Sequence, residues 1–180
     1  LRGLLEVTAL TQSVLRQAYD TVSVKDRRWR NAWSAIDVIV NPNGPYYRGG
    51  SDGDNGQTGR KLVMDFYGPR IPVGGGALSG KHPAHIDRLA AYTARHAAIH
   101  SVRTGSRECT LRLVYAPNTN EPLDVNWEVD GRGERLAKTF FNFDAMLSRL
   151  DPTKITADLG KGTHFWDTNL PWRSEEHTSE

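Results

Sequence analysis

The sequence predicts an α+β fold, in which a mixed sheet is covered on one face by helices. Segments with strand and helix character follow one another in the order β, α, β, β, α, which is typical of helices packed on a sheet. The 180 residues are 38% hydrophobic, which is enough to bury one core, or one domain and part of another.

The N-terminal part of the chain predicts a helix and a strand. Apolar residues at helical spacing indicate a helix from Leu4 to Val24, packed on a sheet. Trp33 to Val40 reads as a strand that ends at the Asn-Pro-Asn-Gly turn of residues 41–44. A short apolar strand, Lys61 to Tyr67, then lies between two glycine-rich loops.

The C-terminal part predicts a helix, two strands and a second helical region. The helix runs from Pro83 to about Ser101 and has a small-residue face. Strands are expected at Cys109–Tyr115 and Leu123–Val129, with helical character between Glu134 and Leu150. Aromatic residues in and after this region are expected to pack in the core: Phe140, Phe141, Phe143, His164, Phe165, Trp166 and Trp172.

Composition restricts the classes of partner and the compartment. The net charge is only +2, and no basic run carries the interleaved aromatic residues of a nucleic-acid groove, so no nucleic-acid partner is expected. The lone Cys109 cannot form an internal disulfide and is expected to be a buried apolar filler. No apolar run has membrane-spanning length and no signal peptide is recognised, which fits a cytoplasmic protein without a membrane partner.

Two glycine-rich loops followed by cations resemble a cradle for a polyphosphate. The first loop contains Asp54 and ends in Gly59-Arg60-Lys61, and the second is the Gly-Gly-Gly-Ala-Leu-Ser-Gly-Lys run of residues 74–81. Glycine lets backbone N–H groups approach a ligand, and Pro83 suits the first turn of a helix whose free N–H groups favour anions. The alternative is that both loops are surface turns with solvated cations.

The same segment resembles the C-terminal third of S-adenosylmethionine synthetase (methionine adenosyltransferase). The family pattern is GDxGLTGRK followed by GGGAFSGKDxxKVDRSAAYAAR, and this chain has GDNGQTGRK and GGGALSGKHPAHIDRLAAYTAR. The likeness begins upstream at VNPNGPYYRGG, which is similar to the family's INPTGRFVIGGP, and ends near Leu170-Pro171-Trp172. It covers about residues 36–172, and the GGGALSGK…DR run is very specific.

The resemblance implies a reaction, its substrates and its ions. Enzymes of this family join ATP and L-methionine, and the tripolyphosphate that leaves is hydrolysed to pyrophosphate and phosphate. They use Mg²⁺ and K⁺, are built from three units related by pseudo-threefold symmetry, and assemble as a homodimer or a dimer of dimers. Catalysis of this displacement is expected to come from positioning and from cations that stabilise the leaving oxygens.

The resemblance also assigns roles to particular residues of this chain. Arg60, Lys61 and Lys81 are the expected triphosphate-binding and catalytic cations. Asp87 matches an aspartate of the family's magnesium site, although a solvated acid in the first helical turn is the alternative. The remaining expected ATP- and methionine-binding residues are Tyr46, where the family stacks an aromatic ring on adenine, Asp54, Ala77 and His85.

Three departures from the family pattern put the methionine side of the site in doubt. His85 replaces a family lysine and is largely neutral near pH 7. His82 stands where the family often has aspartate, a better helix cap, and Pro69 to Val73 replaces a more glycine-rich link. The alternative function is therefore a catalytically inactive paralogue that binds nucleotide or polyphosphate, and a third is a structural subunit.

The domain organisation follows from the same resemblance. Residues 1–48 are expected to be the end of the middle domain, and 49–172 the C-terminal domain. Residues 173–180 resemble a translated sequencing adapter rather than native sequence. The chain starts at Leu1 and lacks the family's His-Pro-Asp-Lys motif, so it is expected to form no S-adenosylmethionine alone.

Overall fold

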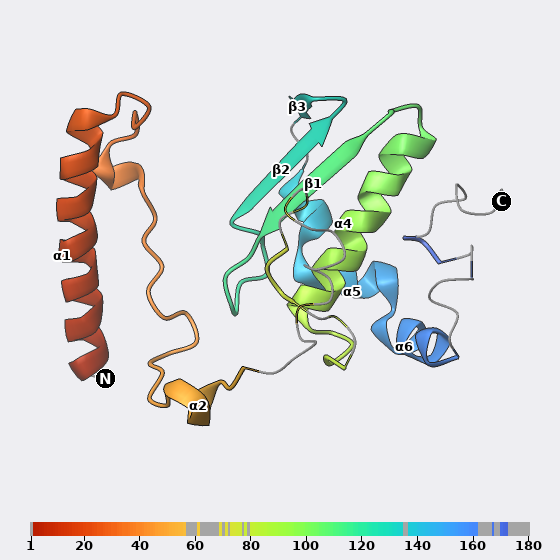
Figure 1. Ribbon diagram of the computed structural model, residues 1–180, viewed down its shortest axis with the longest axis horizontal. Helices are drawn as coiled ribbons and strands as arrows, with labels where there is room; N and C mark the ends of the chain where they lie inside the picture. Colours follow the sequence, from red (N-terminus) through yellow and green to blue (C-terminus); the bar gives the residue numbers. More distant parts are fainter. Residues whose placement is uncertain are drawn as a thin grey trace. The chain divides into compact units, whose positions relative to one another are not determined.

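The chain divides into two compact units, residues 1–56 and 57–180, which are described separately (Figure 1). The computed structural model describes residues 2–56, 61, 69, 71, 73–76, 78, 80–134, 137–161, 167 and 170–172. The predicted strand Lys61–Tyr67 and the C-terminal residues 173–180 lie outside the described part, apart from Lys61 itself. The predicted domain boundary between residues 48 and 49 stays a prediction.

The first unit consists of one long helix and an irregular segment that returns along it. Helix α1 spans Arg2–Lys25, as predicted, and is followed by the 3₁₀ turn η1, Trp33–Ala35, and the single-turn helix α2, Gly50–Gly53. The ring of Tyr19 lies 5.8 Å from that of Trp29 and 5.6 Å from that of Trp33, measured between centroids. These aromatic contacts hold the segment after α1 against the C-terminal half of the helix.

One prediction for this unit is wrong, and another stays a prediction. Residues 33–40 form η1 and irregular backbone rather than a strand. The strand at 33–40 is absent because the described part of this unit contains no other strand to bond its backbone. The prediction that helix α1 packs on a sheet stays a prediction; among its described side chains, Leu5 is 70% exposed and Leu10 is 66% exposed.

The second unit contains a three-stranded antiparallel sheet, which confirms the α+β class. Its strands are β1, Cys109–Val114; β2, Asp124–Val129; and β3, Arg132–Glu134, in the order β1-β2-β3. Two strands were predicted within one residue, whereas β3 was missed. It follows the two-residue turn Asp130-Gly131, where both residues have positive φ (50° and 76°), as a tight hairpin turn requires.

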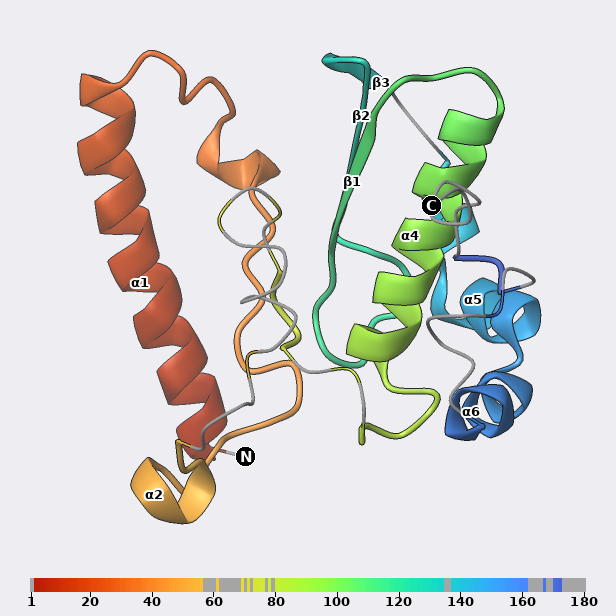
Figure 2. The same cartoon turned by 45° about the vertical axis from the view of Figure 1, so that its right-hand side comes forward.

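Three helices lie on one side of this sheet (Figure 2). They are α4, Ile86–Arg103; α5, Phe143–Leu150; and α6, Pro152–Gly160, which was not predicted. The core between them joins Leu89 and Tyr92 of α4 to a set of C-terminal residues: Met146, Leu150, Ile155, Leu170 and Trp172. Of the three phenylalanines predicted to be core, Phe141 is fully buried, Phe143 packs at the core edge, and Phe140 stays 37% exposed.

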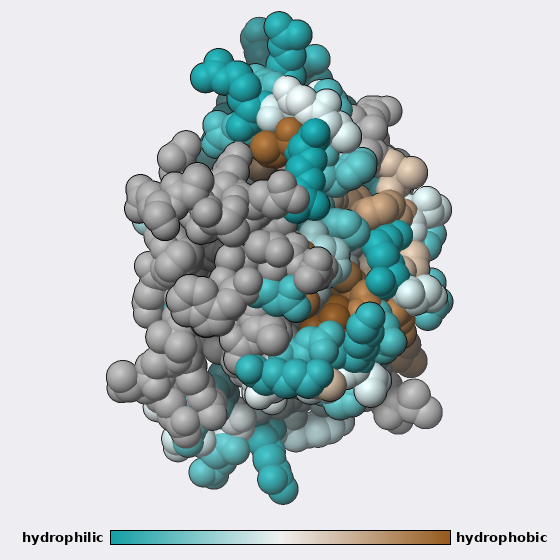
Figure 3. All heavy atoms as spheres, turned by 90° about the vertical axis from the view of Figure 1, so that its right-hand side faces the viewer, coloured by the Kyte–Doolittle hydropathy of each residue, from teal (hydrophilic) through white to brown (hydrophobic). Residues whose placement is uncertain are grey.

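One side of the molecule can be judged by its hydropathy where the described residues are coloured. On the side seen in Figure 3, hydrophilic residues surround a smaller hydrophobic area.

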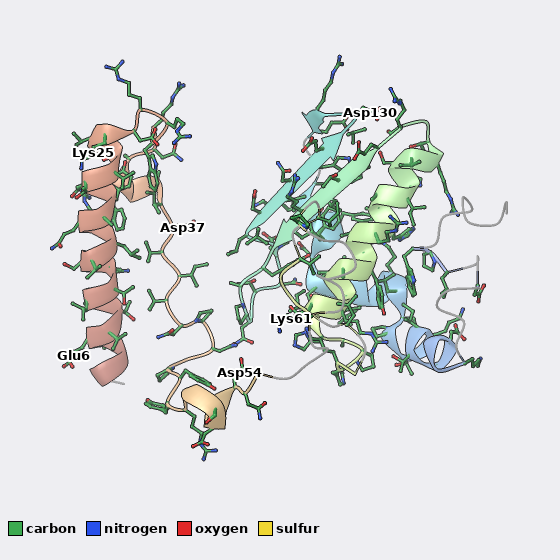
Figure 4. All side chains as sticks on the ribbon, viewed as in Figure 1. Glu6, Lys25, Asp37, Asp54, Lys61 and Asp130 are labelled. Atoms are coloured by element: carbon green, nitrogen blue, oxygen red, sulfur yellow. The ribbon has the colours of Figure 1, made fainter. Side chains whose placement is uncertain are left out.

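Asp130, labelled in Figure 4, accepts hydrogen bonds from the backbone N–H groups of Arg107 and Glu108, both at 2.9 Å, and so ties the β2–β3 turn to the start of β1. None of the described helices is long and apolar enough to cross a membrane.

Burial changes the acidity of two groups near the sheet. It raises the pKa of the Cys109 thiol, which agrees with a packing role rather than an activated nucleophile. It also raises the pKa of Tyr115 to about 12. The Tyr115 hydroxyl donates a 2.7 Å hydrogen bond to the carbonyl of Phe141, which only the neutral phenol can do.

The protein is expected to lose stability at alkaline pH through Tyr115. Its pKa is near 10 in the unfolded chain and about 12 in the folded one, so the folded state retains the proton more strongly. The stabilisation is therefore complete below pH about 10 and lost as pH rises toward 12. Urea unfolding between pH 8 and about 11.5 should show a steeper decline for the wild type than for Tyr115→Phe; parallel declines would contradict this assignment.

Candidate functional site

The candidate site is built at the N-terminal end of α4. His85 is the N-cap residue (φ −64°, ψ 134°), and its Nδ1 accepts the backbone N–H of Asp87 at 3.1 Å. Ahead of it, His82 Nδ1 accepts the N–H of Ala84 at 3.2 Å. The helix consequently begins at Ile86, and the prediction that Pro83 lies in its first turn is wrong, because the histidine cap sits two residues further on.

Lys81 and Asp87 form the centre of the site. Lys81 Nζ lies 2.5 Å from Asp87 Oδ2 and also donates to the backbone carbonyl of Gly75. The two side chains are about a quarter and a third exposed, so the pair is only partly screened by water. The sequence predicted both residues for the site, and the structure brings them into contact.

Gly75 must be glycine because the Asp87 side chain lies against its backbone. A methyl group placed on Gly75 would come within 2.5 Å of Cβ and Cγ of Asp87, closer than real side chains approach. The neighbouring Gly74 would meet no atom within 4 Å. The glycine-rich loop and the first turn of α4 are therefore packed directly on each other at this one position.

Arg88 is a site neighbour that the sequence analysis did not select. It lies in the first turn of α4 and is only 7% exposed. Its Nη1 donates to the backbone carbonyl of Lys81 at 3.0 Å. Its position directly after Asp87 in the Ile-Asp-Arg run was the one sequence feature that could have marked it as a site neighbour. Its burial, however, depends on residues far away in the sequence, which the run does not reveal.

The other predicted site residues divide into two groups. Lys61 is described and exposed, whereas Arg60 and Ala77 lie outside the described residues. Tyr46 and Asp54 belong to the first unit, where the Tyr46 hydroxyl lies against Gly53, next to Asp54. Figure 4 labels Asp54, which directly follows α2, and Lys61, which belongs to the second unit. The backbone N–H of Asp54 donates to the carbonyl of Gly50 at the start of α2.

The chemistry of the described cluster is that of a cation beside a carboxylate. An ammonium at Lys81 suits phosphate oxygens, and the helix start adds a positive dipole end. The Asp87 carboxylate is paired with the Lys81 ammonium, and its oxygens are of the type that a hard metal ion prefers. In the described part of the chain, no group of three or more His, Cys, Asp or Glu side chains is arranged to hold a metal.

The cap geometry predicts that His85→Lys destabilises the protein. Lysine has no acceptor for the Asp87 N–H, so the free energy of unfolding should fall by about 1 kcal/mol. His85→Asn, which keeps a good cap, is the matched control and should stay near the wild type. Urea unfolding measures both variants; a lysine variant as stable as the asparagine variant would show that the cap contributes nothing.

The chain matches a family model along most of its second unit. Residues 48–170 match the model described as "S-adenosylmethionine synthetase, C-terminal domain". The chain is similar to the S-adenosylmethionine synthase of Methylobacterium nodulans, with 43% identity over 159 residues, which cover 86% of this chain and 38% of that protein. It is also similar to the enzyme of that name from Bradyrhizobium diazoefficiens, with 48% identity over 121 residues, 67% of this chain and 30% of that protein.

The matched relatives are longer than this chain. The chain spans about a third of their length, 33% in the case of the synthase from a Bradyrhizobium species that is 42% identical over 130 residues. Among solved structures, it is similar to an S-adenosylmethionine synthetase from Campylobacter jejuni, described as unusual. That comparison covers 92% of this chain and 42% of the other, with 25% identity and a TM-score of 0.37.

Proposed function

Because the chain belongs to the S-adenosylmethionine synthetase family, we propose that it is the C-terminal portion of an enzyme that forms S-adenosylmethionine from ATP and L-methionine. In this proposal, phosphate and pyrophosphate are released by way of tripolyphosphate. The observation that carries it is the contact of Lys81 with Asp87 and Gly75, which unites a phosphate-binding cation, a carboxylate and a glycine loop at a helix start.

The proposed catalytic contribution of this region is stabilisation of the departing triphosphate. The neutral sulfur of methionine displaces a leaving group with several negative charges, and cations fixed in advance stabilise its oxygens. Lys81 supplies one cation from the described cluster. Arg60 and Lys61 are proposed to supply the others, Arg60 as a two-pronged donor and Lys61 as a point charge.

Asp87 is the proposed magnesium ligand. Magnesium in nucleotide enzymes is held by one or two carboxylates together with phosphate oxygens and water, and Asp87 would supply a carboxylate of this kind beside Lys81. When bound, the ion neutralises charge on the phosphate oxygens. Potassium is proposed as the second ion of the enzyme on the family resemblance alone.

For the nucleoside and methionine end, the family resemblance supports roles for Tyr46, Asp54, Ala77 and His85. Tyr46 would stack on the adenine, and Asp54 and Ala77 would lie beside the nucleotide. His85 stands where the family has lysine. Because its Nδ1 accepts the hydrogen bond that caps α4, only Nε2 is left to contact a ligand, so its contribution to methionine binding is proposed to be weaker than that of lysine.

The whole protein is proposed to be a homodimer or a dimer of dimers in the cytoplasm. Residues 1–48 would belong to its middle domain and residues 49–172 to its C-terminal domain. The chain spans about a third of the length of its relatives, and by itself it is proposed to bind polyphosphate without forming product.

A single assay tests this function. The chain is joined to the remainder of its reading frame, supplied with ATP, methionine, Mg²⁺ and K⁺, and S-adenosylmethionine is measured by mass spectrometry. Product formation is the expected result. The absence of product, combined with retained tripolyphosphate binding, would instead support the inactive paralogue that the His85 substitution suggests.

A further inference from the structure

The starting observation is that Arg88 is a buried cation held by a backbone carbonyl. Its residue is 7% exposed, and its Nη1 donates to the carbonyl oxygen of Lys81 at 3.0 Å. Burying a guanidinium is unfavourable unless it is hydrogen-bonded, and a carbonyl that accepts from a charged donor makes a stronger bond than one that accepts from a neutral donor. The Lys81 backbone is thus fastened to α4 through this side chain.

Arg88 in turn rests on an aromatic stack. Its Cζ lies 5.9 Å from the centroid of the Tyr92 ring, one helical turn further along α4. The Tyr92 ring is stacked on that of Trp172, with centroids 4.4 Å apart and planes inclined by 13°. Tyr92 and Trp172 are 6% and 5% exposed, so the stack belongs to the core. The order of contacts is therefore Trp172, Tyr92, Arg88 and the Lys81 backbone.

We propose that Arg88 is a positioning residue, which sets the backbone of Lys81 so that the Lys81 ammonium reaches its ligand. This inference rests on the proposed function for what the ligand is, a polyphosphate. Arg88 itself points its donor at the Lys81 carbonyl, and its effect on the ligand passes through Lys81.

The physical reason is the flexibility of lysine. The lysine side chain has a four-carbon stem with many rotamers, so fixing its ammonium requires a fixed backbone as well as a partner for the head group. In this structure Asp87 and Gly75 hold the head group, and Arg88 holds the carbonyl at the other end of the same residue. A site loosened by about 1 Å loses much of its binding and catalysis, which is why an anchor of this kind matters.

The first test measures tripolyphosphate binding by calorimetry in the presence of Mg²⁺, using the complete 180-residue chain. Arg88→Met keeps the length and apolar stem of the side chain but removes the charged donor, and should weaken binding about tenfold. Arg95→Met is the matched control, because Arg95 is an exposed arginine of the same helix, and it should bind as the wild type does. Arg88→Lys, which restores one donor, should recover part of the affinity.

A double-variant comparison separates positioning from direct contact. If Arg88 acts through Lys81, adding Arg88→Met to a Lys81→Met chain should change the affinity no further. Wild-type affinity in Arg88→Met would overturn the inference, and so would an equal loss in both backgrounds, because the latter indicates an arginine that touches phosphate itself.

Hydrogen exchange provides a readout that does not depend on the ligand. In Arg88→Met, and in Trp172→Leu, which removes the stack, exchange of the backbone amides of residues 80–82, 84 and 85 should accelerate about tenfold, while the amides of β1 and β2 stay unchanged. Unchanged exchange at residues 80–85 in a folded variant overturns the inference even if tripolyphosphate never binds. Failure of the wild type to bind tripolyphosphate, together with the accelerated exchange, refutes the proposed function alone.

Discussion

Lys81→Ala is expected to reduce S-adenosylmethionine formation by about a hundredfold to a thousandfold in the protein that carries this chain. Removing one preorganised donor to a developing anion costs about 3–4 kcal/mol of transition-state stabilisation, which gives a loss of that size. The measurement is steady-state turnover with saturating ATP and methionine. Tripolyphosphate affinity of the chain alone should fall in parallel, because the same ammonium binds the product phosphates.

The fold should tolerate this substitution. The Lys81–Asp87 pair is partly exposed, and pairs of that kind contribute at most about 1 kcal/mol to stability. Lys154→Ala, at an exposed lysine of α6, is the matched control and should leave both activity and stability unchanged. Wild-type turnover in Lys81→Ala would contradict the proposal that this region binds the triphosphate, since that proposal depends on the Lys81 ammonium.

Gly75→Ala is expected to disrupt the site through a steric clash. The added methyl carbon would lie 2.5 Å from two carbons of Asp87, so either the glycine loop or the start of α4 must shift. Either shift separates Lys81 from Asp87 and the Gly75 carbonyl. Tripolyphosphate affinity should fall by at least about tenfold, and the free energy of unfolding should fall by about 1–3 kcal/mol, as in other overpacked sites.

Gly74→Ala supplies the comparison for this prediction. It makes the same change one residue earlier, where an added methyl group meets nothing within 4 Å. Its stability should remain within about 0.5 kcal/mol of the wild type and its affinity should be unaffected. Equal behaviour of the two variants would mean that the loop does not pack on Asp87.

Local sequence patterns predicted the helices and strands whose own residues carry a clear apolar or strand-forming pattern. Helix α1 follows from its apolar spacing, and β1 and β2 follow from strand-forming residues bounded by turn residues. Helix α4 was predicted in type and place, but its first residue was not, because a histidine at position 85 caps the helix in place of a more usual residue. Strand β3 was missed because its three residues are too few to show an alternating pattern, and helix α6 is also short, with nine residues.

The predicted strand at Trp33–Val40 shows where sequence reasoning fails for a physical reason. A strand is stable only when a neighbour takes its backbone hydrogen bonds, and the described part of this unit contains no other strand. Residues 36–40 therefore have strand-forming side chains, but the described part of the unit offers no neighbouring strand with which they could form a sheet.

The sequence by itself determined the family, the glycine-rich loops and the residue types of the candidate site, because these are local properties of the GDNGQTGRK and GGGALSGK…DR runs. Only the tertiary structure decided that Lys81 meets Asp87, that Gly75 is pressed against that carboxylate, and that Arg88 is buried beneath Lys81. Those contacts depend on Tyr92 stacking with Trp172 and on a core drawn from distant parts of the chain, and no local pattern of residues encodes such packing.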